Sequence, residues 1–306
     1  MSIVFFGTPE FAVPSLKALI RSGEEISLVV TQTDKRKGRG HKLTPPPVKL
    51  AAIDAGLRVR QPATLKDNAV SYEIAELKPE FIVVVAYGKI LPKSILEIPR
   101  HGCINVHASL LPKYRGAAPI SWAIIRGEKK TGITTMRMDE ELDAGPILLR
   151  SELEITREDT AYSLGRKLSD LGASLLKETL EGLRNGSVRP VLQTDEATFA
   201  PALKKEDGLI DWSRSAEDIF NFIRGMQPWP GAYCHIDREA IKILKVEPTA
   251  GSGVPGAIEK ITQHELIVGT ANGLLSLLEV QPPGKKSMPA SAFLQGRKLQ
   301  QGMTLT

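Results

Sequence analysis

The chain has 306 residues, 42% of them hydrophobic and 25% charged, which is ample apolar material for one large or two ordinary globular domains. Its longest apolar run, residues 81–86, is too short to cross a bilayer, and residues 1–7 lack the basic start and cleavage site of a signal peptide. We therefore expect a cytoplasmic protein with no membrane partner. The two cysteines, Cys103 and Cys234, lie far apart and offer neither a disulfide framework nor a CxxC metal site.

The net charge of +5 and the isoelectric point near 9.1 are only mildly basic, so the distribution of charge is more informative than the total. Residues 34–42, DKRKGRGHK, carry five Lys or Arg against one Asp. The glycines in this segment predict a flexible loop that can follow a backbone of phosphates. A charged loop that is merely solvated is the alternative interpretation.

The first two thirds of the chain alternate strand-like and helix-like segments, which is typical of βαβ units and a mainly parallel sheet. Residues 83–86 are hydrophobic without alternation and predict a central strand covered on both faces. The next predicted strand, 102–107, leads into a polar loop at the carboxyl end of the sheet, where open α/β sheets bind ligands. Before these two strands, the pattern predicts strands at 3–6 and 26–31, helices at 14–22 and 48–55, and a strand beginning at Val59.

The polar loop begins with an amide and an imidazole two residues apart. Asn105 and His107 fall on the same side of the predicted strand, so both can address one reacting carbonyl group. A third polar group is needed to orient the imidazole, and Asp143, in the turn-like segment 141–146, is the best candidate. The pattern predicts acyl-group chemistry with Asn105, His107 and Asp143 as the catalytic residues.

Other chemistries fit the sequence less well. The first strand ends in GTPEF without the GxGxxG fingerprint of a dinucleotide site, and no GxxxxGK[ST] phosphate loop is present. Ser109 has no GxSxG elbow around it, so a turn residue is the stronger interpretation and a nucleophile the weaker one. His101, Cys103 and His107 would be strung out along one strand, which suits tetrahedral zinc poorly. We expect neither a metal nor a nicotinamide nucleotide.

Further elements are predicted downstream. A helix at 119–126 begins with Pro119, a strand at 131–139 carries the chain toward Asp143, and leucines at helical spacing predict a helix at 160–184. Residues 188–207 have the composition of a linker. After it, a helix at 216–224 and short strands predict a small antiparallel barrel, with strands at 231–235, 240–245, 256–260, 265–270 and 274–280.

The trio, together with the segment SLLPKYRGAAPI at 109–120, resembles the formyltransferases that use 10-formyltetrahydrofolate. Among these formyltransferases, the methionyl-tRNA formyltransferases of translation initiation are similar to the chain in three further sequence segments. These are GTPEFA at 7–12, the segment at 31–49, and a C-terminal region with MQPWPGA and QPPGKK. The resemblance implies that 10-formyltetrahydrofolate is a co-substrate and that methionyl-initiator tRNA is the partner. It also implies that the folate-site loop contains Ser109, Leu110, Leu111 and Pro112.

The resemblance changes the interpretation of the basic segment, because an acceptor stem offers a phosphate backbone that a small amine lacks. We expect a tRNA contact formed by Lys35, Arg36, Lys37, Arg39 and Lys42. Two alternatives remain open. One is a formyltransferase that uses the same trio on a small amine or a sugar nucleotide, and the other is a nucleic-acid-binding module that has lost catalysis.

The expected fold is therefore of the α/β class. A Rossmann-like formyltransferase domain with a mainly parallel sheet spans residues 1–189, and residues 190–208 form a linker. Residues 209–306 form a β-barrel, which the resemblance implies to be of the oligonucleotide-binding type and to help hold the tRNA. We expect the protein to act as a monomer.

Overall fold

The computed structural model describes residues 2–37, 42–66, 68–194, 196–236, 239–295 and 297–306. These residues form two compact units. Unit 1 comprises Met1–Pro119, Lys130–Glu154 and Gly165–Pro201, and unit 2 comprises Ile120–Lys129, Ile155–Leu164 and Ala202–Thr306. In the part of the chain that the structure describes, no helix is both long enough and apolar enough to span a membrane.

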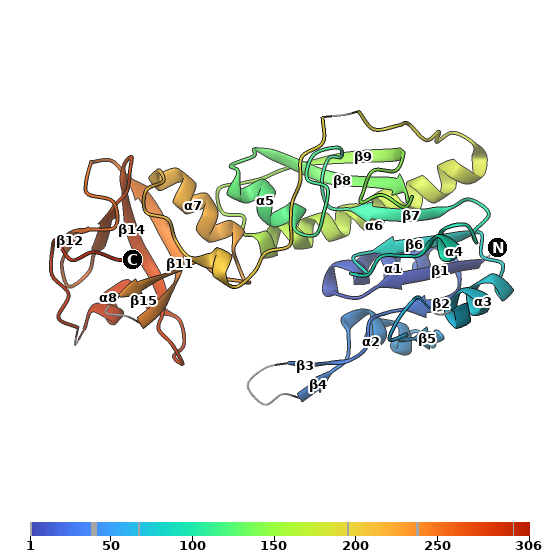
Figure 1. The fold of residues 1–306 in the computed structure, drawn as a ribbon, viewed down its shortest axis with the longest axis horizontal. Helices are drawn as coiled ribbons and strands as arrows, with labels where there is room; N and C mark the ends of the chain where they lie inside the picture. The colour runs from blue at the N-terminus through green and yellow to red at the C-terminus, as the bar shows by residue number, and fades with distance from the viewer. Residues whose placement is uncertain (1, 38–41, 67, 195, 237–238, 296) are drawn as a thin grey trace. The chain divides into compact units, whose positions relative to one another are not determined.

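Unit 1 is built around a seven-stranded sheet with the strand order β5-β2-β1-β6-β7-β8-β9 (Figure 1). The first five strands in this order are parallel, and β8 and β9 continue the sheet in antiparallel fashion. The strands are β1 (Ser2–Gly7), β2 (Glu25–Val30), β5 (Val59–Arg60), β6 (Phe81–Val85), β7 (Cys103–His107), β8 (Lys130–Arg137) and β9 (Ile147–Glu154). The mainly parallel sheet is confirmed, whereas β9 has no counterpart among the predicted strands.

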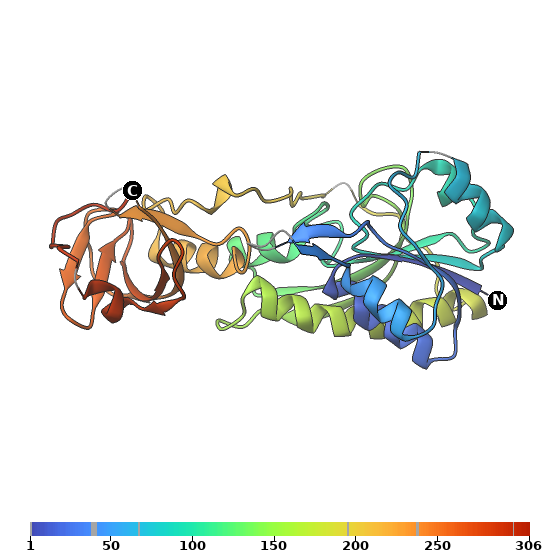
Figure 2. The same ribbon diagram turned by 90° about the horizontal axis from the view of Figure 1, so that it is seen from below.

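Helices cover both faces of this sheet (Figure 2). The helices α1 (Val13–Arg21) and α6 (Ala161–Asn185) lie on one face. The close approach of α6 depends on Gly172, where a Cβ atom would lie 2.9 Å from Val106 Cγ1 on β7. The other elements of this part of the chain are η1 (Glu10–Ala12), α2 (Pro47–Asp54), α3 (Asn68–Glu76) and α4 (Lys93–Leu96).

The central strands form because their side chains are apolar on both faces. Every residue of β1 and of β6 is buried, which confirms the predicted covered central strand for residues 83–85, whereas Ala86 follows the strand and is exposed. On one face, a hydrophobic cluster combines residues of β1 and β6 with residues of α3 and α4, among them Val4, Ile82, Val70, Ile74 and Ile95. Burying each such side chain contributes about 1.5–3 kcal/mol, so the sheet is a rigid base for the loops at its carboxyl edge.

The basic segment is partly ordered by backbone pairing. Strands β3 (Lys35–Lys37) and β4 (Lys42–Thr44) form a two-stranded antiparallel ladder. The expectation of a flexible loop is therefore wrong for these two arms, because the glycines in the sequence fall between the arms and leave both free to pair. The predicted contact residue Arg39 lies outside the described residues.

Unit 2 contains an antiparallel sheet with the strand order β10-β11-β14-β13-β12, and β15 adds to β14. Its long strand β11 pairs with two neighbours and carries bulges near Lys245, and bulges bend and twist a sheet. The fold expected from the short C-terminal strands is confirmed. Its elements are η2 (Glu206–Gly208), α7 (Ala216–Gly225), β10 (Tyr233–Ile236), β11 (Glu239–Thr249), β12 (Ile258–Ile261), β13 (Leu266–Gly269), β14 (Leu274–Gln281), β15 (Met288–Pro289) and α8 (Ala290–Leu294), with α5 (Pro119–Ile125) earlier in the chain.

Residues 191–194 and 196–200, which we call the strap, run along the loop that follows β7. The amide of Val191 donates to Ile147 O and the amide of Ile147 donates to Val191 O, both at 2.8 Å. Further along, Arg115 N donates to Thr198 O and Ala200 N donates to Arg115 O, again at 2.8 Å. The strap, which has the composition of a linker, is thus hydrogen-bonded to Ile147 of β9 and to the loop that follows β7.

Candidate active site

Strand β7 carries two predicted catalytic residues to the carboxyl edge of the sheet. Its side chains alternate, so Val106 faces α6 while Cys103, Asn105 and His107 share the opposite face. Cys103 belongs to the hydrophobic core, Asn105 is half-buried and His107 is only 6% exposed. The strand therefore presents an amide and an imidazole side by side in a sheltered position.

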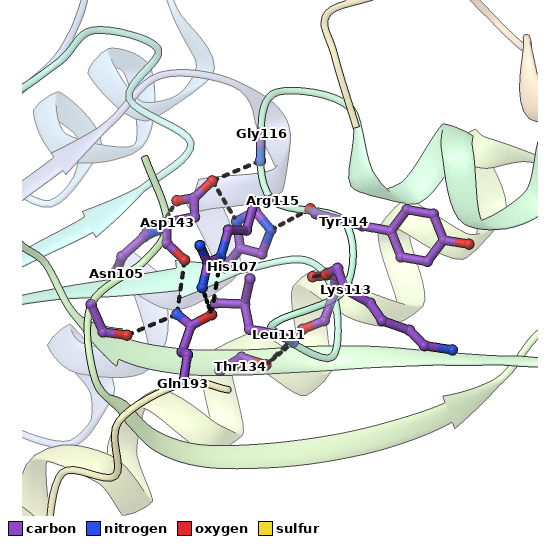
Figure 3. Close-up of polar contacts among 12 residues, drawn as sticks. Asn105, His107, Leu111, Lys113, Tyr114, Arg115, Gly116, Thr134, Asp143 and Gln193 are labelled. Atoms are coloured by element: carbon purple, nitrogen blue, oxygen red, sulfur yellow. Dashed lines mark hydrogen bonds and ion pairs between the residues drawn. The ribbon is translucent and has the colours of Figure 1, made fainter. Parts of the chain in front are cut away.

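Asp143 meets both of these side chains (Figure 3). Its Oδ1 accepts a hydrogen bond from Asn105 Nδ2 at 3.3 Å, and its Oδ2 lies 3.6 Å from His107 Nδ1. A third contact fixes the carboxylate, because Gly116 N donates to Oδ2 at 2.9 Å. The structure thus brings together the three residues that sequence reasoning selected, although they are 38 positions apart at the extremes.

The turn that carries Asp143 is tight. Asp143 has a φ of 49°, a left-handed conformation that residues other than glycine rarely adopt. At Gly145 a Cβ atom would lie 2.0 Å from Arg137 O, so only glycine fits there. The sharp return of the chain between β8 and β9 is what brings the carboxylate back to β7.

The His107 ring lies between two hydrogen-bond acceptors. Its Nε2 is 3.0 Å from Tyr114 O, and since a carbonyl oxygen only accepts, this nitrogen carries a proton in the observed geometry. Its Nδ1 faces the Asp143 carboxylate at ion-pair distance. The carbonyl and the carboxylate together fix the orientation of the ring.

The loop predicted to bind folate is held from within. Ser109 Oγ donates to Lys113 O at 2.6 Å, which agrees with a turn residue and not with a nucleophile. Thr134 of β8 donates to Ser109 O at 2.7 Å and accepts from Leu111 N at 3.1 Å. The Leu111 side chain packs in a core cluster with Met136 and Ile147. The loop can therefore present its backbone to a ligand while its leucine anchors it.

Apolar side chains are exposed near this edge of the sheet. Ile90, in the segment that follows β6, is 86% exposed, and Leu142, which precedes Asp143, is 62% exposed. Exposed apolar groups flanking convergent polar groups are typical of sites for flat, partly apolar ligands.

Gln193 of the strap is a site residue that sequence reasoning missed. Its Nε2 donates to Asp143 O and to Gly145 O, both at 2.8 Å, and its Oε1 accepts from two nitrogens of Arg115. No sequence motif marks it, because a glutamine in a linker-like segment is ordinarily a solvated residue. Only the path of the strap reveals its place.

Those predicted tRNA contacts that fall in the described part of the chain lie on the basic hairpin formed by β3 and β4. Lys35 and Arg36 on β3 and Lys42 on β4 are exposed, and Lys37 lies at the end of β3. The base of the hairpin is anchored by Asp34, whose carboxylate accepts from Gln61 at 2.7 Å and from Lys49 at 2.9 Å. Those hydrogen bonds, with that of Gln61 first, lower the pKa of Asp34 below its usual range. The carboxylate is thus well suited to hold the hairpin at neutral pH.

Other chemistry-bearing side chains have structural roles. His101 stacks on Phe81 with ring centroids 5.1 Å apart, and its Nε2 lies 3.9 Å from Glu80. Burial raises the pKa of the Cys103 thiol to about 12, so it is not a nucleophile near neutral pH. Among the described residues, no three His, Cys, Asp or Glu side chains are grouped so that they could hold a metal ion.

Comparison with known proteins assigns the chain to a family. Residues 1–180 match the family Formyl transferase, and residues 202–298 match the family Formyl transferase, C-terminal domain. The chain is 58% identical to a methionyl-tRNA formyltransferase of Thermodesulfovibrio yellowstonii, with 98% of this chain and 97% of the relative covered. It is 51% identical to a methionyl-tRNA formyltransferase of Citrifermentans bemidjiense, with 99% and 95% covered.

Solved structures of low sequence identity share the fold. An N-formyltransferase from Helicobacter canadensis in complex with folinic acid and dTDP-3-aminofucose has a TM-score of 0.69 and 19% identity, covering 90% of this chain and 98% of that chain. HypX from Aquifex aeolicus in complex with tetrahydrofolic acid has a TM-score of 0.64 and 18% identity, covering 98% of this chain. The present chain spans about half the length of HypX, 50%. The chain belongs to the formyltransferase family of enzymes.

Proposed function

We propose that this enzyme transfers the formyl group of 10-formyltetrahydrofolate to the free α-amino group of methionyl-initiator tRNA, giving N-formylmethionyl-tRNA. The observation that carries the proposal is the contact of Asn105 and His107 with the single carboxylate of Asp143 at the carboxyl edge of the sheet. Full-length similarity to methionyl-tRNA formyltransferases supports the choice of acceptor. The geometry suits acyl transfer because hydrogen-bond donors and a proton acceptor converge on one point.

The first step is attack of the amine on the formyl carbon. An α-amino group is partly unprotonated near neutral pH, so the enzyme needs no strong base to generate the nucleophile. The developing oxyanion needs a fixed donor. Asn105 Nδ2 has two hydrogens and gives one to Asp143 Oδ1, so its second hydrogen is available to the oxyanion.

The second step is collapse of the tetrahedral intermediate. The new C–N bond remains, the bond from the formyl carbon to N10 of the folate breaks, the amine loses a proton and N10 gains one. His107 relays this proton through Nε2, which exchanges its contact with Tyr114 O for the reacting group, while Asp143 beside Nδ1 keeps the ring in orientation.

The substrates divide between the regions of the chain. The loop with Ser109, Leu110, Leu111 and Pro112 would contact the folate, with the exposed Ile90 and Leu142 close to the same edge of the sheet. The basic hairpin with Lys35, Arg36, Lys37 and Lys42, together with Arg39 from the same sequence segment, would contact phosphates of the tRNA. We assign folate binding and catalysis to residues 1–189 and a further part of tRNA binding to residues 209–306, joined by 190–208.

An acceptor panel tests the proposal. The purified protein is mixed with 10-formyltetrahydrofolate and, separately, with methionyl-initiator tRNA, uncharged tRNA, free methionine and an amino-sugar nucleotide, and the release of tetrahydrofolate is followed. We expect release with methionyl-initiator tRNA alone. Release with the sugar nucleotide but not with the charged tRNA would identify the enzyme as a small-amine formyltransferase, and no release with any acceptor would favour a binding module.

A further inference from the structure

We infer that Gln193 is a positioning residue of the formyl-transfer site, which ties the Arg115 side chain to the turn that carries Asp143 and so holds the carboxylate against Asn105 and His107. Gln193 touches neither reacting group, and its action passes through Asp143. The inference deepens the proposed function and rests on it, because its test measures the kinetics of formyl transfer to methionyl-initiator tRNA.

Every hydrogen-bonding position of the Gln193 amide is used (Figure 3). Both hydrogens of Nε2 reach main-chain carbonyls of the turn, Asp143 O and Gly145 O, each at 2.8 Å. Oε1 accepts from Arg115 Nε at 3.1 Å and from Arg115 Nη2 at 2.8 Å. A rotated amide would place its oxygen against two carbonyl oxygens and its NH₂ group against a guanidinium, so one orientation is strongly preferred.

The turn needs this support because its backbone is strained. Asp143 adopts a left-handed φ of 49°, which is unfavourable for a residue with a Cβ atom. Such a conformation persists only when its surroundings hold it in place. Gln193 fixes the carbonyl groups at Asp143 and Gly145, which are two of the groups that would move if the turn relaxed.

A second restraint reaches Asp143 through the loop after β7. The strap pairs with Arg115 through Thr198 O and Ala200 N, and the next residue, Gly116, donates its N–H to Asp143 Oδ2 at 2.9 Å. The same strap therefore holds the carboxylate through Gly116 and the main chain through Gln193. The Arg115 charge also polarises the amide that it binds, which strengthens the bonds on the far side of the amide.

The size of the expected effect follows from the geometry of catalysis. Asp143 Oδ1 and Oδ2 lie 3.3 and 3.6 Å from Asn105 and His107, so a small drift of the turn removes both contacts. A displacement of about 1 Å in a catalytic group can cost about a hundredfold in rate. Binding of tRNA by the basic hairpin has no need of this turn, so the substitution should lower kcat and leave the KM for tRNA nearly unchanged.

Two substitutions test this role. Gln193→Ala removes the amide, and Gln193→Glu keeps the length and a partner for Arg115 but turns a carboxylate oxygen toward the two carbonyls. We expect kcat for methionyl-initiator tRNA to fall by about tenfold to a hundredfold in both, with KM within about twofold of the parent. Leu192→Ala, a neighbouring change at a side chain that is 80% exposed, is the matched control and should retain the parent kcat.

A test in the Asp143→Ala background separates positioning from general stability. Because Gln193 acts through Asp143, adding Gln193→Ala to Asp143→Ala should lower kcat by less than about twofold further. A second drop as large as the first would overturn the positioning role, and so would a parent-like kcat in both Gln193 single variants. A parent protein that formylates no methionyl-tRNA would instead overturn the proposed function, so the two failures are distinct.

Discussion

The catalytic trio and the basic hairpin lie on the same unit but are built in opposite ways. The trio is sheltered, with the side chains of His107 and Asp143 only 7% and 14% exposed, and these two side chains are each held by at least two polar contacts. The hairpin presents exposed cations on two short strands and is fixed mainly at its base by Asp34. Bond-making requires fixed geometry, whereas attraction to a polyanion requires accessible charge and tolerates variation in position.

This contrast predicts that substitutions in the two regions change different kinetic constants. Changes in the trio should lower the rate at saturating substrate, and changes in the hairpin should lower the affinity for tRNA.

The largest effect is expected at the trio. Asn105→Ala, His107→Ala and Asp143→Ala should each lower kcat by on the order of a hundredfold or more, because each removes a donor or its support at the reacting carbonyl. Formyl transfer at saturating 10-formyltetrahydrofolate and tRNA gives the rate, and circular dichroism checks the fold. If one folded variant keeps near-parent turnover, the residue replaced in it has no role in the mechanism.

The second-largest effect is expected when the positive charges of the hairpin are removed. Replacing Lys35, Arg36 and Lys42 by Gln should raise the KM for tRNA about tenfold or more and leave kcat within about twofold. Each lost phosphate contact lowers the slope of log affinity against log salt by about 0.7–0.9, so the triple variant should lose about two units of slope. Binding titrations over a range of salt concentrations measure both quantities.

A charge-matched control separates local contact from total charge. The triple variant with Lys17, Arg21 and Lys177 changed to Gln removes the same charge from exposed positions on α1 and α6. We expect it to bind tRNA like the parent. Equal losses in both triple variants would show that net charge, and not the hairpin, attracts the tRNA.

Within the basic sequence segment 34–42 we expect Arg39→Ala to be the most damaging single change. Arg39 stands between Gly38 and Gly40 in the sequence, and a guanidinium can bridge phosphates or stack on an unpaired terminal base. The Arg39→Ala variant should lose more affinity for tRNA than the Lys35→Ala variant does. Its affinity for folate, measured by calorimetry, should equal that of the parent. A loss no greater than that of Lys35→Ala would remove its special role.

The anchor of the hairpin should have a smaller effect. Asp34→Asn keeps the shape but weakens the bonds to Lys49 and Gln61, so the KM for tRNA should rise about fivefold. Since the pKa of Asp34 is lowered, its contribution is present above the usual carboxyl range and is lost only as the pH falls through the lowered value. A parent tRNA affinity that changes between pH 6 and pH 8, with the change absent in Asp34→Asn, would contradict this assignment.

The sequence was sufficient for features that depend on local patterns. The buried strand β6, the long helix α6 and the convergence of Asn105, His107 and Asp143 follow from periodicity, turn residues and strand-end position. Contacts that depend on chain path were not accessible in this way. Gln193 lies 50 residues from Asp143, and nothing in its neighbourhood in the sequence indicates that the strap passes beside the turn.

The hairpin shows a different limit of sequence reasoning. Glycine and charge in the basic segment favoured a loop, yet Lys35 pairs with Thr44 and Lys37 with Lys42. Short strands of charged residues have weak β-propensity, so cross-strand pairing and the anchor at Asp34, which are nonlocal, decide the outcome. The edge strand β9 was missed as well, since only half of its residues face the core.

The most direct measurement is single-turnover formylation of methionyl-initiator tRNA at increasing salt concentration, with saturating 10-formyltetrahydrofolate. We expect the rate constant at saturating tRNA to stay within about twofold, because the sheltered trio is little affected by salt, while the apparent affinity falls linearly on a log–log plot. A rate constant that falls in parallel with affinity, or an affinity independent of salt, would contradict the division between a sheltered catalytic site and an exposed electrostatic contact.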